Sequence, residues 1–184
     1  MKVFASAVAL VATVLVTSVA VVPPAAAQAA PSVAVVNIQV ILRDSLAAKA
    51  IRSQMKGHLL KFQKWGKGRE DKIRRETQDL LKQRTVLAQS AFAKRQKALR
   101  KKMADFRVEV RRREQKLRQA GGKAQRQLRK VLIAAVSDVA RKQGVSMVFP
   151  KAGLLYSGST KDLTQKLLVR LNAKLPTVKV VLPK

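Results

Sequence analysis

The fold is decided by the stretch from Leu99 to Ala135, which reads LRKKMADFRVEVRRREQKLRQAGGKAQRQLRKVLIAA. It contains no proline, and its apolar residues recur at alternating steps of four and three. The series is Leu99, Met103, Phe106, Val110, Leu117, Ala120 and Ala124, with Arg113 at one position, and after a shift Leu128, Val131 and Ala135. Such spacing, kept over many turns, predicts a long helix whose apolar seam packs in a coiled coil.

The residues before this stretch supply a partner helix. From about Ile41 to Arg84 there is no proline, and apolar residues recur between Leu42 and Leu80. Residues 86–90 lack this charged, periodic character, and Ser90 is a good N-cap for the second helix. Two long helices joined by a short connection fold back antiparallel. We therefore predict a hairpin arm over residues 43–143, with its tip near 86–91 and a length of roughly 60–75 Å.

Strand-like segments flank the arm on both sides. Ser32 to Ile38 is short and β-branched, and a helix stop at Gly144 is followed by strand patterns at Val145–Phe149 and Leu154–Tyr156. A capping pattern at Asp162 and Gln165 opens a helix over residues 163–174, and residues 178–182 form a last predicted strand. Residues 28–42 and 144–184 would thus form a small α/β body, into which the arm is inserted.

This body is too small to cover its own strand edges or to bury much apolar surface. We therefore expect subunits to associate through it. The expected interface consists of Val33, Val35, Ile38, Val148 and Leu155.

Residues 1–27 have the pattern of a cleaved export signal. A short basic start precedes an uncharged apolar run to Val22, and the sequence PPAAA follows. Small residues before the cut suit a signal peptidase, so we predict cleavage after Ala27, with Ala29 as the second choice. About 20 apolar residues could also remain as a membrane anchor, which has no need of PPAAA. The absence of cysteine is compatible with an oxidising compartment.

The chain is strongly basic, with 39 Lys and Arg against 10 Asp and Glu and a net charge of +29. Arg43 to Lys142 holds 31 basic and 9 acidic residues, more imbalance than solubility needs, which favours attraction of anions over a merely solvated face. Sparse aromatic residues argue against stacking on nucleic acid. The candidate anion-binding residues are Arg74, Arg75, Arg100, Lys101, Lys102, Arg111, Arg112 and Arg113.

Two further groups in the arm allow two readings each. Phe62 and Trp65 are either seam residues or apolar side chains that face a bound partner. Glycine costs about 1 kcal/mol inside a helix relative to alanine. Gly57, Gly121 and Gly122 therefore form either a hinge, with Gly57 opposite residues 120–121, or neutral positions in a solvated arm.

Nothing in the sequence predicts an enzyme. His58 is the single histidine and has no acidic residue within a helical turn, whereas acid–base catalysis needs a positioned partner. Gly66-Lys67-Gly68 and Gly121-Gly122-Lys123 lack the spacing of a phosphate-binding loop and do not follow a strand. We expect no catalytic residues, no cofactor and no metal.

Four stretches resemble the Skp (OmpH-type) periplasmic chaperones: SVAVVNIQVILRDSLAAKA from Ser32, GVSMVFP from Gly144, GLLY from Gly153 and DLTQKLLVRLN from Asp162. The resemblance covers essentially the whole mature chain. It implies a mostly α protein in which a long antiparallel coiled-coil hairpin is inserted between terminal strands, assembled as a jellyfish-like homotrimer. It also implies a periplasmic holdase that encloses unfolded outer-membrane β-barrel proteins between its arms without ATP. The arm glycines, the Trp65 patch and the high basic excess depart from the family pattern.

Two other classes stay open. One is a basic exported coiled coil that binds anionic lipid or nucleic acid, and the other is a membrane-anchored structural coiled coil. Export argues against nucleic acid, so no nucleic-acid partner is expected, whereas anionic lipid or lipopolysaccharide remains a candidate partner. The mature N-terminus would decide whether an anchor is retained.

Overall fold

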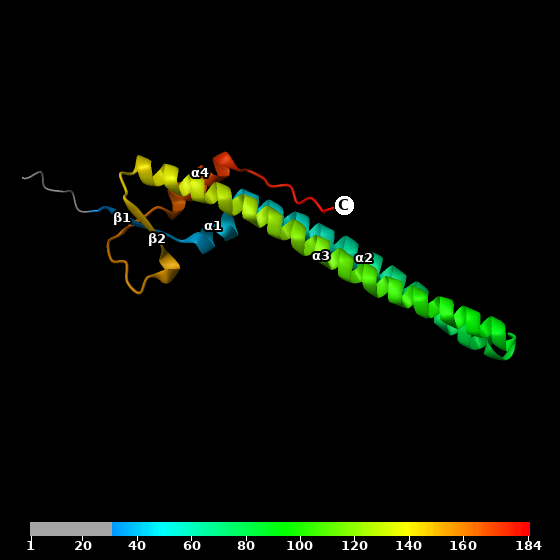
Figure 1. The fold of residues 1–184 in the computed structure, drawn as a ribbon. Coiled ribbons are helices and arrows are strands. Elements are labelled where there is room, and N and C mark those ends of the chain that lie inside the picture. The colour runs from blue at the N-terminus through cyan, green and yellow to red at the C-terminus, as the bar shows by residue number, and fades with distance from the viewer. Residues whose placement is uncertain (1–30) are drawn as a thin grey trace, which may run out of the picture. The chain divides into compact units, whose positions relative to one another are not determined.

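The computed structural model describes residues 31–184 of the chain (Figure 1). The predicted signal peptide, residues 1–27, lies outside the described residues. The elements in chain order are β1 (Val33–Val36), α1 (Ile38–Asp44), α2 (Leu46–Lys82), a 3-10 turn (Gln83–Thr85), α3 (Gln89–Lys142), β2 (Met147–Pro150), a second 3-10 turn (Lys151–Gly153), β3 (Lys161–Asp162) and α4 (Thr164–Lys174). The predicted fold class is confirmed: the described chain is mostly helical, and the α2–α3 hairpin is inserted in the sequence between β1 and the strands β2 and β3.

The two long helices pack with most of their buried residues at the root of the arm, residues 46–60 of α2 and 116–142 of α3. On α3 the buried residues are Ala120, Gly121, Ala124, Leu128, Leu132, Ala135 and Val139. The seam therefore continues through Leu132, and the predicted seam residue Val131 lies partly buried at its flank. Of residues 61–119, only Leu80 is buried, so the distal arm has little core of its own.

The tip is closed by backbone hydrogen bonds. The carbonyl of Gln83 accepts from the amides of Val86 and Leu87 at 3.2 and 3.0 Å. The N-cap of α3 is Ala88, which makes no side-chain capping bond, so the predicted cap at Ser90 is wrong by two residues. The hydrogen bonds of the 3-10 turn serve the amides of Val86 and Leu87 and do not replace a side-chain cap of α3.

The start of the arm is a broken helix where the sequence predicted a continuous one. Ser45 has ψ 144° and separates α1 from α2. Its hydroxyl accepts from the amide of Ala48 at 3.3 Å, and Asn172 of α4 accepts from the amide of Leu46 at 2.9 Å. Asn37 caps α1 in the same way through the amide of Val40. These side chains satisfy one free amide of α1 and two of α2, and the contact with Asn172 ties the start of α2 to α4.

The strands form one parallel sheet in the order β2-β1-β3, with Val33 opposite Met147 and Val35 opposite Asp162. The predicted first strand was too long because Ile38 already starts α1. The predicted strand at Leu154–Tyr156 is wrong: β3 is formed by residues 161–162, and Leu155 is fully exposed. A short apolar run has strand propensity, but it does not say which segment pairs with β1.

The last predicted strand, residues 178–182, is also wrong as a sheet element. It lies outside the sheet and runs along the hairpin (Figure 1). Val178 and Val180 nevertheless join the buried cluster that contains Ile51, Leu128 and Leu167. One core therefore unites β1, the root of the arm, α4 and this C-terminal segment.

Among residues 31–184, no helix is both long enough and apolar enough to cross a membrane.

Candidate functional site

An aromatic cluster lies between the two helices of the arm. The rings of Phe62 and Trp65 stack at 5.9 Å, and Trp65 meets Phe106 of α3 at 5.7 Å. The guanidinium of Arg113 lies 4.0 Å from the centre of the Trp65 ring, a cation–π geometry. Trp65 is half-buried, so it both packs in the seam and keeps part of its ring accessible.

A cavity of about 390 Å³ opens beside this cluster. Trp65, Ile73 and Phe106 form its apolar wall. Its charged rim consists of Arg69, Lys72, Lys102, Glu76, Asp105 and Glu109. Apolar and charged groups therefore meet in one open site, which suits a ligand that carries both kinds of side chain.

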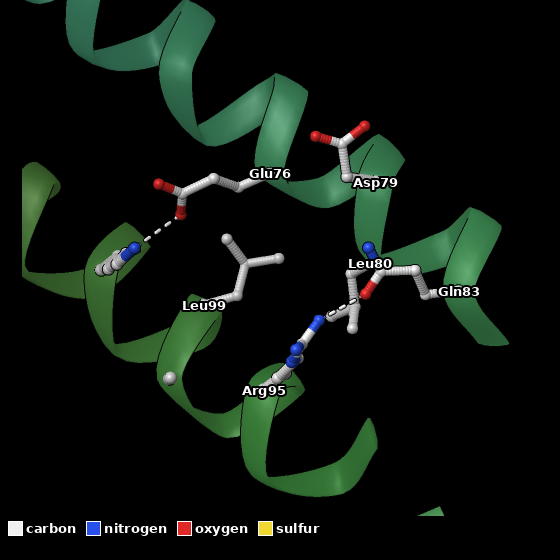
Figure 2. A pocket seen from close by; sticks show the side chains of 8 residues that line it. Glu76, Asp79, Leu80, Gln83, Arg95 and Leu99 are labelled. Atoms are coloured by element: carbon white, nitrogen blue, oxygen red, sulfur yellow. Dashed lines mark hydrogen bonds and ion pairs between the residues drawn. The ribbon is translucent and has the colours of Figure 1, made fainter. Parts of the chain in front are cut away.

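A second cavity, of about 270 Å³, lies nearer the tip. Figure 2 shows Leu80 and Leu99 between the helices, with Glu76, Gln83 and Arg95 around them. Lys102 pairs with Glu76 at 2.7 Å, and Arg95 donates to the side chain of Gln83. Such exposed ion pairs contribute little stability, so these polar contacts and the small apolar contact between Leu80 and Leu99 hold the distal arm only weakly.

The structure divides the predicted basic residues between two levels of the arm. At the first level, the Lys102–Glu76 pair places residues 100–102 of α3 beside residues 74–75 of α2. Glu109 binds Arg113 at 2.7 Å and Arg112 at 3.7 Å, near Trp65. Arg74 pairs with Asp71 on its own helix, and Arg100 donates to Gln96. Arg75, Lys101 and Arg111 are exposed. Acidic partners are too few to neutralise the arm.

The glycines occupy different environments. Gly121 is buried, and a Cβ there would lie 3.3 Å from the terminal carbon of Met55. A Cβ at Gly57 would meet nothing within 4 Å, and one at Gly122 would lie 3.4 Å from the Arg126 side chain. Gly121 therefore faces Met55 rather than Gly57, which was expected opposite residues 120–121. Both helices continue through these positions, and the hinge stays a prediction.

One face of the sheet packs against the core, and the other, here called the open face, is exposed on β2 and at Val33 but buried at Val35. Val148, from the predicted interface, packs against the core, as does Ile38. Val35 is only 2% exposed within the subunit, whereas Val33 is 39% and Leu155 fully exposed. The open face also carries Met147 and Phe149, 44% and 40% exposed, which the sequence analysis missed. Successive side chains of a strand point to opposite faces, so the side chains of residues 147 and 149 lie on the face opposite to that of residue 148. This alternation would have revealed them.

Ion pairs fasten α4 to the end of α3. Asp138 accepts from Lys174 and from Arg170, the latter at 3.2 Å, and it also pairs with Arg141 at 3.3 Å. The hydrogen bonds from Lys174 and Arg170 lower the pKa of Asp138 to about 2. Asp162 of β3 accepts a hydrogen bond from the hydroxyl of Thr164 at the start of α4, and this bond lowers the pKa of Asp162. The same hydroxyl accepts from the amide of Asn37 at 2.8 Å. These links set the body around the root of the arm.

The fold and these surfaces define a small strand-containing body that carries a long, basic helical hairpin. Residues 32–171 match the family of outer membrane proteins described as OmpH-like, and the chain belongs to this family. It is similar to the crystal structure of a candidate outer membrane chaperone (OmpH-like) from Caulobacter crescentus. That match has 18% identity and a TM-score of 0.79 and covers 85% of this chain and 92% of the other, so it supports the fold. The curated proteins include no significant match to the chain.

Proposed function

We propose that this protein is an ATP-independent holdase chaperone that binds unfolded outer-membrane proteins and prevents their aggregation. The observation that carries the proposal is the arm itself, where open cavities combine apolar walls with a charged rim on a strongly basic hairpin. Membership of the OmpH-like family and the chaperone description of the Caulobacter crescentus protein support the same function.

Binding would proceed by two kinds of contact. The excess of 31 basic over 9 acidic residues in the arm attracts acidic segments of a client, the unfolded protein that is held. The exposed part of Trp65 and the apolar walls of the cavities then add short-range contacts. Such contacts are weak and non-directional, so they retain a client without imposing a fold. Release follows when the client folds or is transferred.

The holding form would be a homotrimer joined through the body. The exposed face with Val33, Met147 and Phe149 is apolar and lies on a sheet whose outer strand, β2, has no neighbour on its far side among residues 31–184. Association would cover both the face and the edge. Three arms around one body would enclose a client from several sides. Export by the predicted signal peptide would place this assembly in the periplasm.

Capture kinetics test the electrostatic part of this function. The association rate of an unfolded β-barrel protein should fall steeply with added salt, because charges are screened beyond about 10 Å near 0.1 M. The dissociation rate should change less, since apolar contacts hold the complex. Changing Arg111, Arg112 and Arg113 to Gln should slow capture more than it speeds release. Stopped-flow fluorescence at two salt concentrations measures both rates, and salt-independent capture would contradict the proposal.

Anionic lipid is a second candidate partner, favoured by the tip of the hairpin. Val86 is 84% exposed and Leu81 61%, beside Lys82 and Arg84. Apolar side chains next to basic ones suit the surface of an anionic bilayer. Flotation with anionic and neutral vesicles tests this, and Val86→Asp should release the protein from anionic vesicles. If the unmodified and Val86→Asp proteins bind anionic vesicles equally, the tip is not the lipid contact.

A further inference from the structure

Residues 177–183 form an extended segment on the root of the arm and lie outside the stretch that matches the family, 32–171. Figure 1 shows this C-terminal ribbon running along the hairpin. Its side chains alternate: Val178 and Val180 are 1% and 6% exposed, whereas Val181 is 67% exposed. The segment has the alternation of a strand, yet no strand of the described chain pairs with it.

Its backbone is bound instead by side chains of α2. Gln54 Nε2 donates to the carbonyl of Val178 at 2.7 Å, and Gln54 Oε1 accepts from the amide of Val180 at 2.9 Å. One residue of a parallel neighbouring strand makes this same pair of bonds, so the amide group of Gln54 replaces such a residue. One helical turn further, His58 Nε2 lies 3.3 Å from the carbonyl of Val180. These contacts recognise extended backbone rather than a particular side chain.

The surface continues past the two buried valines. Leu182 and Pro183 lie at a cavity of about 350 Å³ whose other lining residues include Phe62. Its basic wall is formed by Lys61, Arg112, Arg113 and Lys116, and its single acidic residue, Glu109, is already paired with both arginines. A ligand that ran further along this path would meet an aromatic ring and positive charge. We call the surface formed by Gln54, His58, Phe62, Lys61 and Lys116 the root groove.

We propose that the root groove is a binding site for extended polypeptide segments with alternating aliphatic residues followed by acidic ones, and that residues 177–183 occupy it as an internal competitor. Identifying the external ligand as a client rests on the proposed function. Backbone-directed hydrogen bonds accept many sequences, as in proteins that bind added strands. A tethered segment has a high effective concentration, so it excludes weak ligands. An acidic client segment can pair with Lys61 and Lys116 at the basic wall, whereas the internal segment brings only Leu182 and Pro183 to this cavity.

The test compares two substitutions of the same residue type in the full chain, Val178→Asp at a buried position and Val181→Asp at an exposed one. The probe is a fluorescent peptide with the sequence of residues 176–184, PTVKVVLPK. The Val178→Asp protein should bind it at least about tenfold more tightly than the unmodified or Val181→Asp protein does, because only the first loses its internal competitor. Fluorescence anisotropy measures this, with circular dichroism and mass as controls of folding and assembly.

Three further measurements locate the site. Adding Gln54→Leu to the Val178→Asp protein should weaken peptide binding by about tenfold, and a peptide with aspartate at both positions 178 and 180 should not bind. A peptide that ends in glutamate instead of lysine should bind more tightly, because it approaches Lys61 and Lys116. If Val178→Asp impairs folding, Val178→Ala should show the same effect with a smaller magnitude.

Peptide binding that is equal in the Val178→Asp and Val181→Asp proteins would overturn the proposal and make the segment a permanent brace. An unfolded β-barrel protein should displace the labelled peptide from the Val178→Asp protein. A barrel that binds without displacing the peptide would overturn the assignment of clients to this groove. A barrel that binds to no form of the protein would refute the proposed function, while the peptide measurements would still decide whether the groove exists.

Discussion

Replacing the arm glycines by alanine separates a hinge from tight packing. At Gly57 a Cβ meets open space, so Gly57→Ala should raise the free energy of unfolding by about 1 kcal/mol per subunit, the helix penalty of glycine. At Gly121 the Cβ would lie 3.3 Å and 3.4 Å from the thioether end of Met55. That flexible end must move slightly, so we expect a gain below about 0.5 kcal/mol.

Thermal melting at one fixed protein concentration measures the difference. For a chain of this size Gly57→Ala should raise Tm by about 2–4 °C, and Gly121→Ala by clearly less. If the glycines form a hinge, the Gly57→Ala protein should also bind large clients less well relative to small ones. Equal stabilisation at both sites would refute the packing that we assign to Gly121. An unchanged size preference would refute the hinge.

Three further predictions concern the body, the ion pairs and the aromatic cluster. Phe149→Asp should lower the mass measured by light scattering from that of a trimer, whereas Val169→Asp, on the exposed side of α4, should leave the mass unchanged. If the Phe149→Asp protein still has the mass of a trimer, this interface is ruled out. Because the pKa of Asp138 falls from 3.8 to about 2 on folding, its stabilisation is complete above about pH 4 and is lost as the pH falls through 2. The Asp138→Asn protein should therefore lose less Tm between pH 4 and pH 2 than the unmodified protein, and an equal loss would contradict the ion-pair assignment. A double-mutant cycle of Trp65→Ala and Arg113→Ala should give a coupling of about 0.5–1 kcal/mol in chemical denaturation, and zero coupling would exclude the cation–π contact.

The helical arm was predictable because its signal is long and periodic. Steps of three and four residues repeated over many turns allow one seam, and Ala120, Ala124 and Leu128 are buried where that seam predicts. Local chemistry also marked the helix stop at Gly144, which has φ 63°. Such signals depend only on neighbours in the sequence.

The strands were less predictable because a strand is defined by its partner. Leu154–Tyr156 and residues 178–182 have strand composition, but the first is an exposed loop and the second binds to side chains of α2. The pairing of Asp162 with Val35 brings together residues more than a hundred positions apart, which no local pattern specifies. The sequence analysis named Val148 for the expected interface and overlooked the exposed side chains of Met147 and Phe149, because it did not test the parity of residues along the strand.

The basic runs of the arm illustrate a second limit. Composition predicts the excess of positive charge but not which side chains stay available. Glu109 engages both Arg112 and Arg113, and Arg113 also covers Trp65, so this run is partly a structural element of the arm. Arg111, in the same run, is exposed. The pairs of Glu109 follow from i,i+3 and i,i+4 spacing within α3, whereas the contact of Arg113 with Trp65 depends on the register of the two helices.

The central claim, that the arms hold the client and the body only assembles them, is tested most directly by shortening the arm. Lys102 faces Glu76, so residues 72 and 106 lie at matching levels, and residues 73–105 can be replaced by a short Gly-Ser turn. The measurement is light scattering of an unfolded β-barrel protein diluted from denaturant, with the unmodified and shortened proteins at equal concentration. We predict that the shortened protein keeps the mass of a trimer and suppresses aggregation much less than the full-length protein does, because it retains only the root groove. A shortened trimer that protects the client as well as the full-length protein does would contradict the account.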